Sequence, residues 1–296
     1  MQIARYNDDR LGVVRGGDVH DVTALQAEIR SRSPYTYMGD PVVAFLKPPE
    51  NRRTMAETAA KATSVPVASV QLRAPVARPT KLVCAPTNYQ KHIEEMAAAR
   101  VARSSKHTAR IGDDGLFLKA NSALVGPGDG LAVRFPDRRN DHEAELVVVI
   151  GKTGSDIPLA SAFDYVAGYS LGLDMTVRGG EDRSFRKSPD GYAVLGPWLV
   201  TADDISDPDN VPLELTVNGE TRQKSDTSQL IYGVRRLIEF ASSFYTLYPG
   251  DLIYTGTPDG VGPVKAGDVI RVTSAMSLGA LEIAVRARTA GHTESR

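Results

Sequence analysis

A long succession of short β-type segments is the feature that most constrains how this chain can fold. The strands expected after residue 140 are ELVVVIG, VAGYSLGLDM, PWLVT, LELTVNG, DLIYTG, DVIRVTS and GALEIAVRA. One strong helical pattern, GVRRLIEFASSFYTL, interrupts them. Many strands with few helices predict a β-rich α+β fold rather than alternating βαβ units. No Gly-rich loop leads from a strand into a helix, which disfavours a nucleotide-binding fold.

The beginning of the chain predicts a separate, smaller unit. MQIARY and LGVVRG read as strands, DVTALQAEI as a helix with Asp21 as its N-cap, and KPPENRR as a loop. We therefore expect a small N-terminal domain over residues 1–77, a main domain over 78–290 and a tail over 291–296. Early in the main domain, NYQKHIEEMAAARVARSS reads as a helix and SSKHTARIGDDG as a mobile loop of the kind used as a lid.

Composition disfavours several classes of protein. With 296 residues, of which 42% are hydrophobic, the chain can bury a large core. A net charge of -1 provides no basic field for a nucleic acid. Cys84 is the single cysteine, which excludes an intrachain disulfide and fits a cytoplasmic location best. The sequence shows no signal-peptide pattern at its start and no apolar stretch of about 18 residues, so we expect no membrane segment.

Two acidic side chains precede an apolar run in NDHEAELVVVIGK. In a strand, Glu143 and Glu145 share one face, while Ala144 and Leu146 lie on the other. Two such carboxylates repel each other unless a proton or a cation lies between them. Two solvated acids at a strand end are the commoner explanation of this pattern. Here, however, the run continues into LVVVIG, which is typical of a strand buried on both faces, and Asp174 also ends an apolar strand.

These three acids predict a metal site. Glu143, Glu145 and Asp174 would provide oxygen ligands for a hard cation such as Mg2+ or Mn2+. Three protein ligands leave positions for water and a bidentate substrate, which suits a catalytic site better than a structural one. His142 alternates to the opposite face, so we expect it outside the ligand set.

The chain resembles the fumarylacetoacetate hydrolase family, in its smaller bacterial branch, over about residues 81–288. The motifs that carry the resemblance are NYQKHIEEM, FLKANSALVGP, DHEAELVVVIGK, DYVAGYSLGLDMTVR, RKSPDGYAVLGPWLVT, VNGETRQKSDTSQLIY and LYPGDLIYTGTPDGVGPV. It implies mixed β-sheets rolled into a sandwich, a small N-terminal domain and a homodimer. It also implies a Mg2+ or Mn2+ site, and the positions of the family's metal ligands match Glu143, Glu145 and Asp174.

The same resemblance implies roles for three groups near the metal. His92 and Glu95 match the acid/base pair of the family, and their spacing of three places both on one face of a helix. Without the resemblance, a solvated helix surface would explain this pair better. Lys187 matches a lysine that neutralises negative charge developing on the substrate, and Arg178 matches another member of that group. Lys119 and Ser122 of FLKANS receive no role.

Four positions bear on the substrate. Thr257 in TGTPDGVGP is the expected substrate contact, and Tyr89 and Glu181 are further candidates for binding the substrate. The family usually has a glutamine where this chain has Glu181 and an acid where it has Gly179. An ionised carboxylate cannot donate a hydrogen bond as an amide does. Either Glu181 has another task or the substrate differs from that of the relatives.

The expected activity is metal-dependent hydrolysis of a C–C bond in an acylpyruvate or related 2,4-dioxo acid, which releases a pyruvate-type product. His92, aided by Glu95, would deprotonate the attacking water, while the cation acts as a Lewis acid. Decarboxylation or isomerisation of oxaloacetate, or of a 2-oxo diacid from aromatic catabolism, would use the same groups, and the sequence does not separate these reactions.

Two rivals come from other classes. Clustered acids with a lysine also suit a metal-dependent nuclease, but Lys187 is distant from the glutamate pair in sequence and no basic groove is evident. The chain could also be a non-catalytic binding module, although the retained His92, Glu95 and three acids argue against it.

Overall fold

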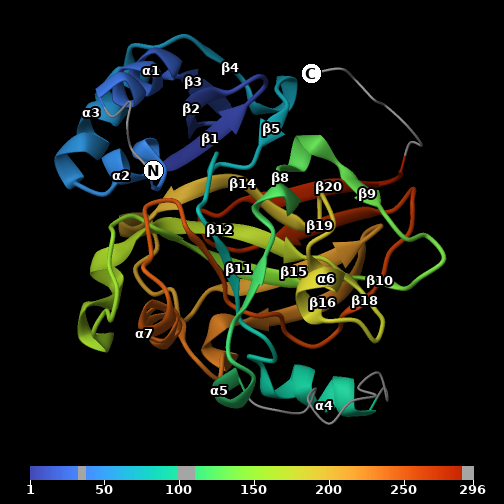
Figure 1. Cartoon of the computed structure of the whole chain (residues 1–296). Coiled ribbons are helices and arrows are strands. Elements are labelled where there is room, and N and C mark those ends of the chain that lie inside the picture. The colour runs from blue at the N-terminus through green and yellow to red at the C-terminus, as the bar shows by residue number, and fades with distance from the viewer. Residues whose placement is uncertain (33–37, 99–110, 289–296) are drawn as a thin grey trace.

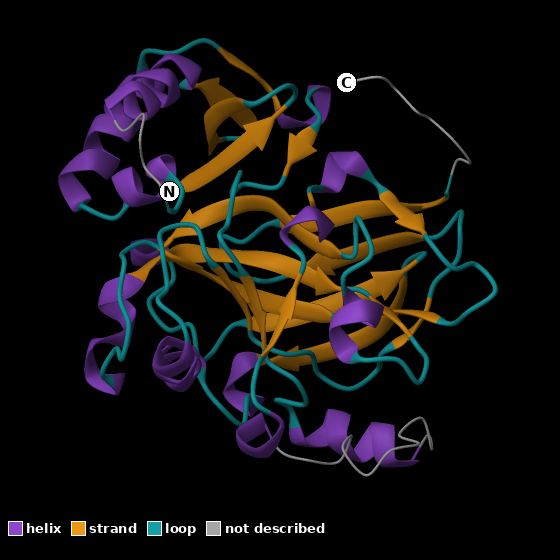
Figure 2. Cartoon of the chain, in the orientation of Figure 1, coloured by secondary structure: helices purple, strands orange, loops and turns teal. Residues whose placement is uncertain are grey.

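Strands dominate the computed structural model, which describes residues 1–32, 38–98 and 111–288 (Figures 1 and 2). The α-helices are α1 (Thr23–Arg32), α2 (Pro41–Leu46), α3 (Pro49–Ala60), α4 (Gln90–Ala98), α5 (Ile111–Asp114), α6 (Arg183–Lys187) and α7 (Val234–Phe244). The strands are β1 (Gln2–Tyr6), β2 (Arg10–Arg15), β3 (Asp18–Asp21), β4 (Ser64–Pro66), β5 (Leu72–Arg73), β6 (Leu82–Cys84), β7 (Phe117–Lys119), β8 (Leu124–Val125), β9 (Leu131–Val133), β10 (Asn140–His142), β11 (Ala144–Ile150), β12 (Val166–Asp174), β13 (Thr176–Val177), β14 (Ala193–Thr201), β15 (Pro212–Val217), β16 (Glu220–Asp226), β17 (Leu252–Tyr254), β18 (Gly262–Pro263), β19 (Val269–Thr273) and β20 (Ala280–Ala287).

Three sheets organise these strands. The large sheet has the order β4-β3-β2-β1-β14-β12-β11-β17-β6-β7, with β5 beside β1 and β8 beside β14. A second sheet runs β16-β15-β19-β20-β9, and a small one runs β13-β10-β18. Most pairs are antiparallel, but β17 pairs with β6, β14 with β8 and β20 with β9 in parallel. The predicted β-rich α+β fold with mixed sheets is confirmed.

The central strand β11 is buried on both faces, as its apolar run predicts. Leu146 and Val148 belong to the core cluster that the strand shares with the second sheet and α7. Val147 and Val149 belong to another cluster, which includes residues of α2 and α3. Glu145 has the parity of Val147, so it projects on that second face, at the end of the strand.

The N-terminal strands extend the large sheet. β1 pairs antiparallel with β14, with Gln2 opposite Val200, and β2 continues the sheet outward from β1. Figure 1 shows β1–β3 and α1–α3 gathered at one end of the molecule. The division of the chain near residue 77 stays a prediction.

The prediction of a loop over KPPENRR is wrong. Lys47 and Pro48 separate α2 from α3, and the rest of the segment forms the beginning of α3 from Pro49 onward. Pro41 and Pro49 each occupy the first turn of a helix, where a missing N–H costs nothing and the fixed φ favours the helix. The Asp40 carboxylate caps α2 by accepting from the N–H groups of Val42 and Val43.

The helix predicted from residue 88 is α4 in the described part of the chain. Its expected continuation over 99–105 and most of the expected lid, 104–110, lie outside the described residues. At the end of the predicted lid segment, Ile111–Asp114 forms the short helix α5. The tail over 291–296 also lies outside the described residues.

Candidate active site

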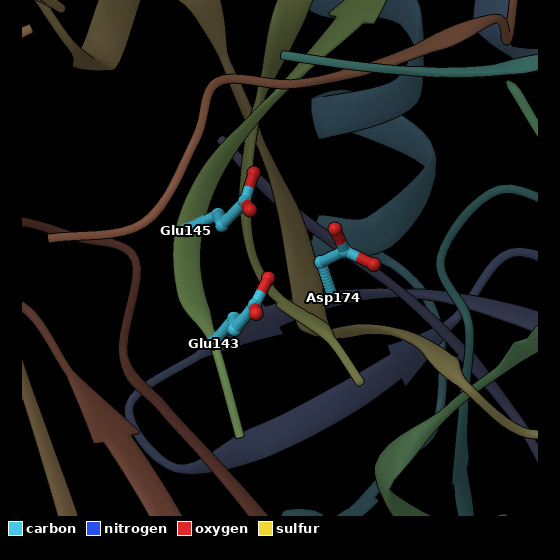
Figure 3. A group of neighbouring side chains, drawn as sticks. All are labelled: Glu143, Glu145 and Asp174. Carbon is cyan, nitrogen blue, oxygen red and sulfur yellow. The ribbon is translucent and has the colours of Figure 1, made fainter. Parts of the chain in front are cut away.

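The three predicted metal ligands converge at the ends of two neighbouring strands. Glu143 directly precedes β11, Glu145 is the second residue of that strand, and Asp174 ends β12. The strands are antiparallel, and the Asp174 N–H donates to the Glu143 carbonyl at 2.9 Å. One carboxylate oxygen of each acid lies within 4.8 Å of the others (Figure 3). Sheet pairing therefore brings together residues that are far apart in sequence.

The three carboxylates are buried close together, so their negative charges repel one another strongly. Glu143, Glu145 and Asp174 are 4%, 2% and 2% exposed, so water screens their charges poorly. Burial, and then the charge of Asp174, raise the pKa of Glu145 well above its ordinary value. Burial would also raise the pKa of Glu143, but Lys187 and Arg178 outweigh it and hold that pKa below its ordinary value. Three carboxylates this close together provide the hard oxygen donors that a divalent cation such as Mg2+ or Mn2+ prefers.

Two of the predicted cations contact this cluster. Lys187 Nζ lies 2.6 Å from Glu143 Oε2 and 2.6 Å from Asp174 Oδ2. Arg178 Nη2 lies 2.8 Å from Glu143 Oε1, while its Nε lies 2.7 Å from Asp141 Oδ2. Burial would lower the pKa of Lys187, but Asp174 and Glu143 raise it above its ordinary value, so the ammonium stays charged. Although Lys187 is distant from the glutamates in sequence, α6 brings its side chain onto the cluster, where the family resemblance implies that it lies.

A second buried lysine, which received no role from the sequence, also binds the cluster. Lys119 forms an ion pair with Asp174 Oδ1. Its ammonium also donates to the carbonyl oxygens of Met175 and Tyr192, at 3.3 and 2.5 Å. The position of Lys119 at the end of an apolar strand was the available signal, since a lysine is rarely buried without a partner.

His92 and Glu95 lie on the same face of α4, as their spacing predicts. His92 Nδ1 lies 3.3 Å from Glu95 Oε2, and the Gly260 N–H donates to Glu95 Oε1 at 3.0 Å. Burial would raise the pKa of Glu95, but the hydrogen bonds from His92 and from the Gly260 backbone hold it below its ordinary value. An ionised carboxylate thus orients the imidazole, and His92 is 6% exposed in the wall of the pocket.

One pocket joins most of the predicted site residues. Its lining consists of Ala85, Pro86, Thr87, His92, Met96, Phe117, Glu143, Glu145, Asp174, Arg178, Arg183, Arg186, Lys187 and Thr257. Glu95 lies outside this lining and contacts it through His92. Tyr89 is also outside the lining: it is 2% exposed, its hydroxyl has no partner among the described residues, and burial raises its pKa. The role predicted for Tyr89 in placing the substrate stays a prediction.

Glu181 and Gly179, the two positions that depart from the family pattern, both lie next to Arg138. Both carboxylate oxygens of Glu181 accept from Arg138, each at 2.8 Å, on the surface outside the pocket lining. A Cβ added at Gly179 would lie 2.0 Å from Arg138 Nη2 and 2.3 Å from Glu181 Oε2. The absence of a side chain at Gly179 therefore makes room for the ion pair. A substrate contact of Glu181 stays a prediction.

Gln223 connects the pocket to the second sheet, and it received no role from the sequence. Its Oε1 accepts from the Ala144 N–H at 3.0 Å, between the two glutamates of the cluster, and lies 3.1 Å from His142 Nδ1. Its Nε2 donates to Thr257 Oγ1 at 2.8 Å and to the Pro258 carbonyl at 3.0 Å. His142 thus points away from the cluster, as expected.

Comparison with known proteins shows which family this chain resembles in sequence. A sequence profile described as fumarylacetoacetate (FAA) hydrolase C-terminal matches residues 81–286. Over 290 residues the chain is 49% identical to a maleylpyruvate hydrolase of Aquipseudomonas alcaligenes, covering 97% of this chain and 99% of that protein. Over 244 residues it is 37% identical to a mitochondrial oxaloacetate tautomerase of Rattus norvegicus, covering 78% of this chain and 75% of that protein.

A solved structure agrees with these sequence relations. The crystal structure of a maleylpyruvate hydrolase from Sphingobium sp. SYK-6 in complex with manganese(II) and pyruvate superposes with a TM-score of 0.80 at 36% identity. The match covers 98% of this chain and all of that one. In the described part of this chain, no helix has both the length and the apolar character needed to cross a bilayer. The chain belongs to the fumarylacetoacetate hydrolase family.

Proposed function

We propose that this protein is a divalent-metal-dependent hydrolase that cleaves the C–C bond between the acyl group and the pyruvate part of an acylpyruvate. Maleylpyruvate is the first candidate substrate, because a relative of that name matches nearly the whole chain. The observation that carries the proposal is the convergence of three buried carboxylates with His92 in one pocket. Such a site can both bind a 2-oxo acid and activate water.

Glu143, Glu145 and Asp174 are the residues that would hold the metal. Mg2+ and Mn2+ both suit this all-carboxylate donor set, and a relative has been crystallised with manganese(II) and pyruvate. A divalent cation bound there would act as a Lewis acid toward the oxygens of the substrate. Lys119 holds Oδ1 of Asp174, and the other oxygen, Oδ2, is contacted by Lys187.

His92 is the proposed general base. Glu95 occupies its Nδ1, so Nε2 is the nitrogen available to a water in the pocket. His92 takes a proton from that water as the oxygen bonds to the acyl carbonyl carbon. The bond between this carbon and the adjacent CH2 of the pyruvate part then breaks, and its electron pair goes to the CH2 carbon. Protonation of that carbon gives pyruvate, and the acyl part leaves as a carboxylic acid.

Lys187 and Arg178 are proposed to stabilise the negative charge that develops on the pyruvate part. Lys187 is buried and Arg178 is partly buried beside Glu143, where a fixed positive charge acts more strongly than in water. Their ion pairs with Asp141, Glu143 and Asp174 orient them before substrate binds. Thr257 is proposed to contact the substrate through its hydroxyl.

A second candidate is tautomerisation or decarboxylation of oxaloacetate, which the similarity to an oxaloacetate tautomerase favours. The Mn2+-loaded protein should be incubated with maleylpyruvate, acetylpyruvate and oxaloacetate, and the products identified by NMR. We expect pyruvate together with maleate or acetate from the first two compounds. Conversion of oxaloacetate alone, with both 2,4-dioxo acids left intact, would contradict the proposal.

The nuclease and the binding module remain weaker alternatives. The proximity of Lys187 to the glutamates removes one argument against a nuclease, but the net charge of -1 still provides no field for DNA. We also propose that the protein works in the cytoplasm as a homodimer. The single cysteine and the family resemblance support this, and size-exclusion chromatography with light scattering would test the oligomeric state.

A further inference from the structure

One cation in the wall of the pocket, Arg186, pairs with no carboxylate of the described residues. Among the described residues, four arginine and lysine side chains line the pocket, namely Arg178, Arg183, Arg186 and Lys187. Arg178 and Lys187 form ion pairs with the acids of the cluster, and Arg183 Nη2 lies 2.9 Å from Asp114 Oδ2. Arg186 is 6% exposed, and in the described part of the chain no carboxylate lies within ion-pair distance of it.

Backbone carbonyl groups hold Arg186 in place without neutralising it. Its Nε donates to the Glu181 carbonyl at 2.9 Å, and its Nη1 donates to the Val177 carbonyl at 3.3 Å. A guanidinium has five N–H donors in a fixed plane, so several remain after these two bonds. A buried cation is costly unless an anion accompanies it, and a planar guanidinium matches a carboxylate in two-point contact.

The place of Arg186 in α6 separates it from the metal-binding cluster. It precedes Lys187, and consecutive helical residues point in different directions, so only one of the two can face a given group. Lys187 contacts Glu143 and Asp174, whereas Arg186 contacts none of the three cluster acids. A ligand of Arg186 would therefore be a group other than the one held at the cluster.

We propose that Arg186 binds a second carboxylate of the substrate, at the end of the acyl group remote from the 2-oxo acid. The inference rests on the proposed function, because that function places the first carboxylate at the cluster. It narrows the substrate class to acylpyruvates whose acyl part is itself an acid. Arg186 then distinguishes dicarboxylic substrates from acylpyruvates with an uncharged end.

The test compares two stable 2-oxo acids of equal chain length. 2-Oxoheptanedioate carries the second carboxylate and 2-oxoheptanoate lacks it, and neither has the second keto group needed for cleavage. Calorimetric titration of the Mn2+-loaded protein should show that the diacid binds about 10- to 100-fold more tightly, as expected for hydrogen bonds to a charged group. Arg186→Met should abolish this preference, and Arg186→Lys should restore part of it.

Arg134→Met is the matched control, because Arg134 pairs with Asp190 outside the pocket lining. It should retain the preference of the wild-type protein. Equal binding of both acids by the wild type, or a preference that survives in Arg186→Met, would overturn the assignment. If Arg186→Met weakens the binding of both acids equally, Arg186 serves the 2-oxo acid end that they share, or the fold. The assignment is then also wrong. Failure of the proposed hydrolysis would appear separately, as intact maleylpyruvate with an unchanged binding preference.

Discussion

At the scale of single residues, Gln223 fixes the direction of the hydrogen bonds around the pocket. The Ala144 N–H can only donate and the Pro258 carbonyl can only accept, so the Gln223 amide has one consistent orientation. Its NH2 group therefore donates to Thr257 Oγ1. In the described part of the chain, Thr257 donates to no protein acceptor, so its hydroxyl hydrogen is available to an oxygen of the substrate.

Paired substitutions test whether Gln223 acts through Thr257. We expect Thr257→Val and Gln223→Met each to lower kcat/KM by about 10-fold, the cost of one hydrogen bond to a charged substrate. The double variant should lower kcat/KM by no more than about 10-fold, because the second substitution removes no further hydrogen bond to the substrate. Steady-state kinetics on one 2,4-dioxo acid measures all three. A multiplicative loss near 100-fold would show that the two residues act independently.

At the scale of elements, the turn after β17 completes the carboxylate cluster. The Gly256 N–H donates to Glu145 Oε2 at 2.7 Å. Gly256 has a φ of +99°, and a Cβ there would lie 2.8 Å from the Cβ of Asn88. Only glycine satisfies both the backbone conformation and the close approach of the chain, so the turn can aim its N–H at the cluster.

Gly256→Ala should reveal this requirement when it is compared with Gly267→Ala. Gly267 has a similar φ of +97°, but nothing lies within 4 Å of the position of its Cβ. Both variants carry backbone strain, and the contact with Asn88 should cost Gly256→Ala about 1–3 kcal/mol more in the free energy of unfolding. Urea denaturation measures the difference. Equal stabilities would mean that the turn relaxes without harm.

The helices of the N-terminal region show what sequence patterns miss at this scale. Long apolar runs such as LVVVI predict their strands, because a strand buried on both faces needs no alternation. α2 and α3 lie in a stretch whose prolines suggest a loop, yet Pro41 and Pro49 each occupy the first turn of a helix. A proline is tolerated in the first turn of a helix but not in its interior. Composition counts the prolines and does not say which of these positions they occupy.

At the scale of the whole molecule, the core crosses the predicted domain boundary. The cluster beneath Val147 and Val149 also contains Ile3, Leu11 and Leu46 from the first 77 residues. β1 covers the edge of β14 as well. Residues 78–296 alone would therefore expose both an apolar face and a strand edge.

A truncated chain tests how separate the two predicted domains are. We expect residues 78–296, produced alone, to aggregate or to unfold without a cooperative transition, whereas the full chain unfolds cooperatively. Differential scanning calorimetry, together with light scattering, compares the two. A monodisperse fragment with a sharp transition would show instead that the first 77 residues are a dispensable domain.

The sequence predicts the site better than it predicts the groups that support it. Spacing and strand parity place Glu143 and Glu145 on one face, and the helical spacing places His92 beside Glu95. Lys119, Arg186 and Gln223 depend on contacts between elements that are distant along the chain. A pattern within one segment does not identify the partners in such contacts, although the place of Lys119 at the end of an apolar strand hints that it has one.

The central claim is that one divalent cation binds between Glu143, Glu145 and Asp174. Calorimetric titration of the metal-stripped protein with Mn2+ tests it most directly, with Asp174→Asn as the matched variant because it keeps the shape and removes the charge. We predict one Mn2+ per chain in the wild type and an affinity at least about 100-fold weaker in the variant. An unchanged affinity and stoichiometry in Asp174→Asn would contradict the claim.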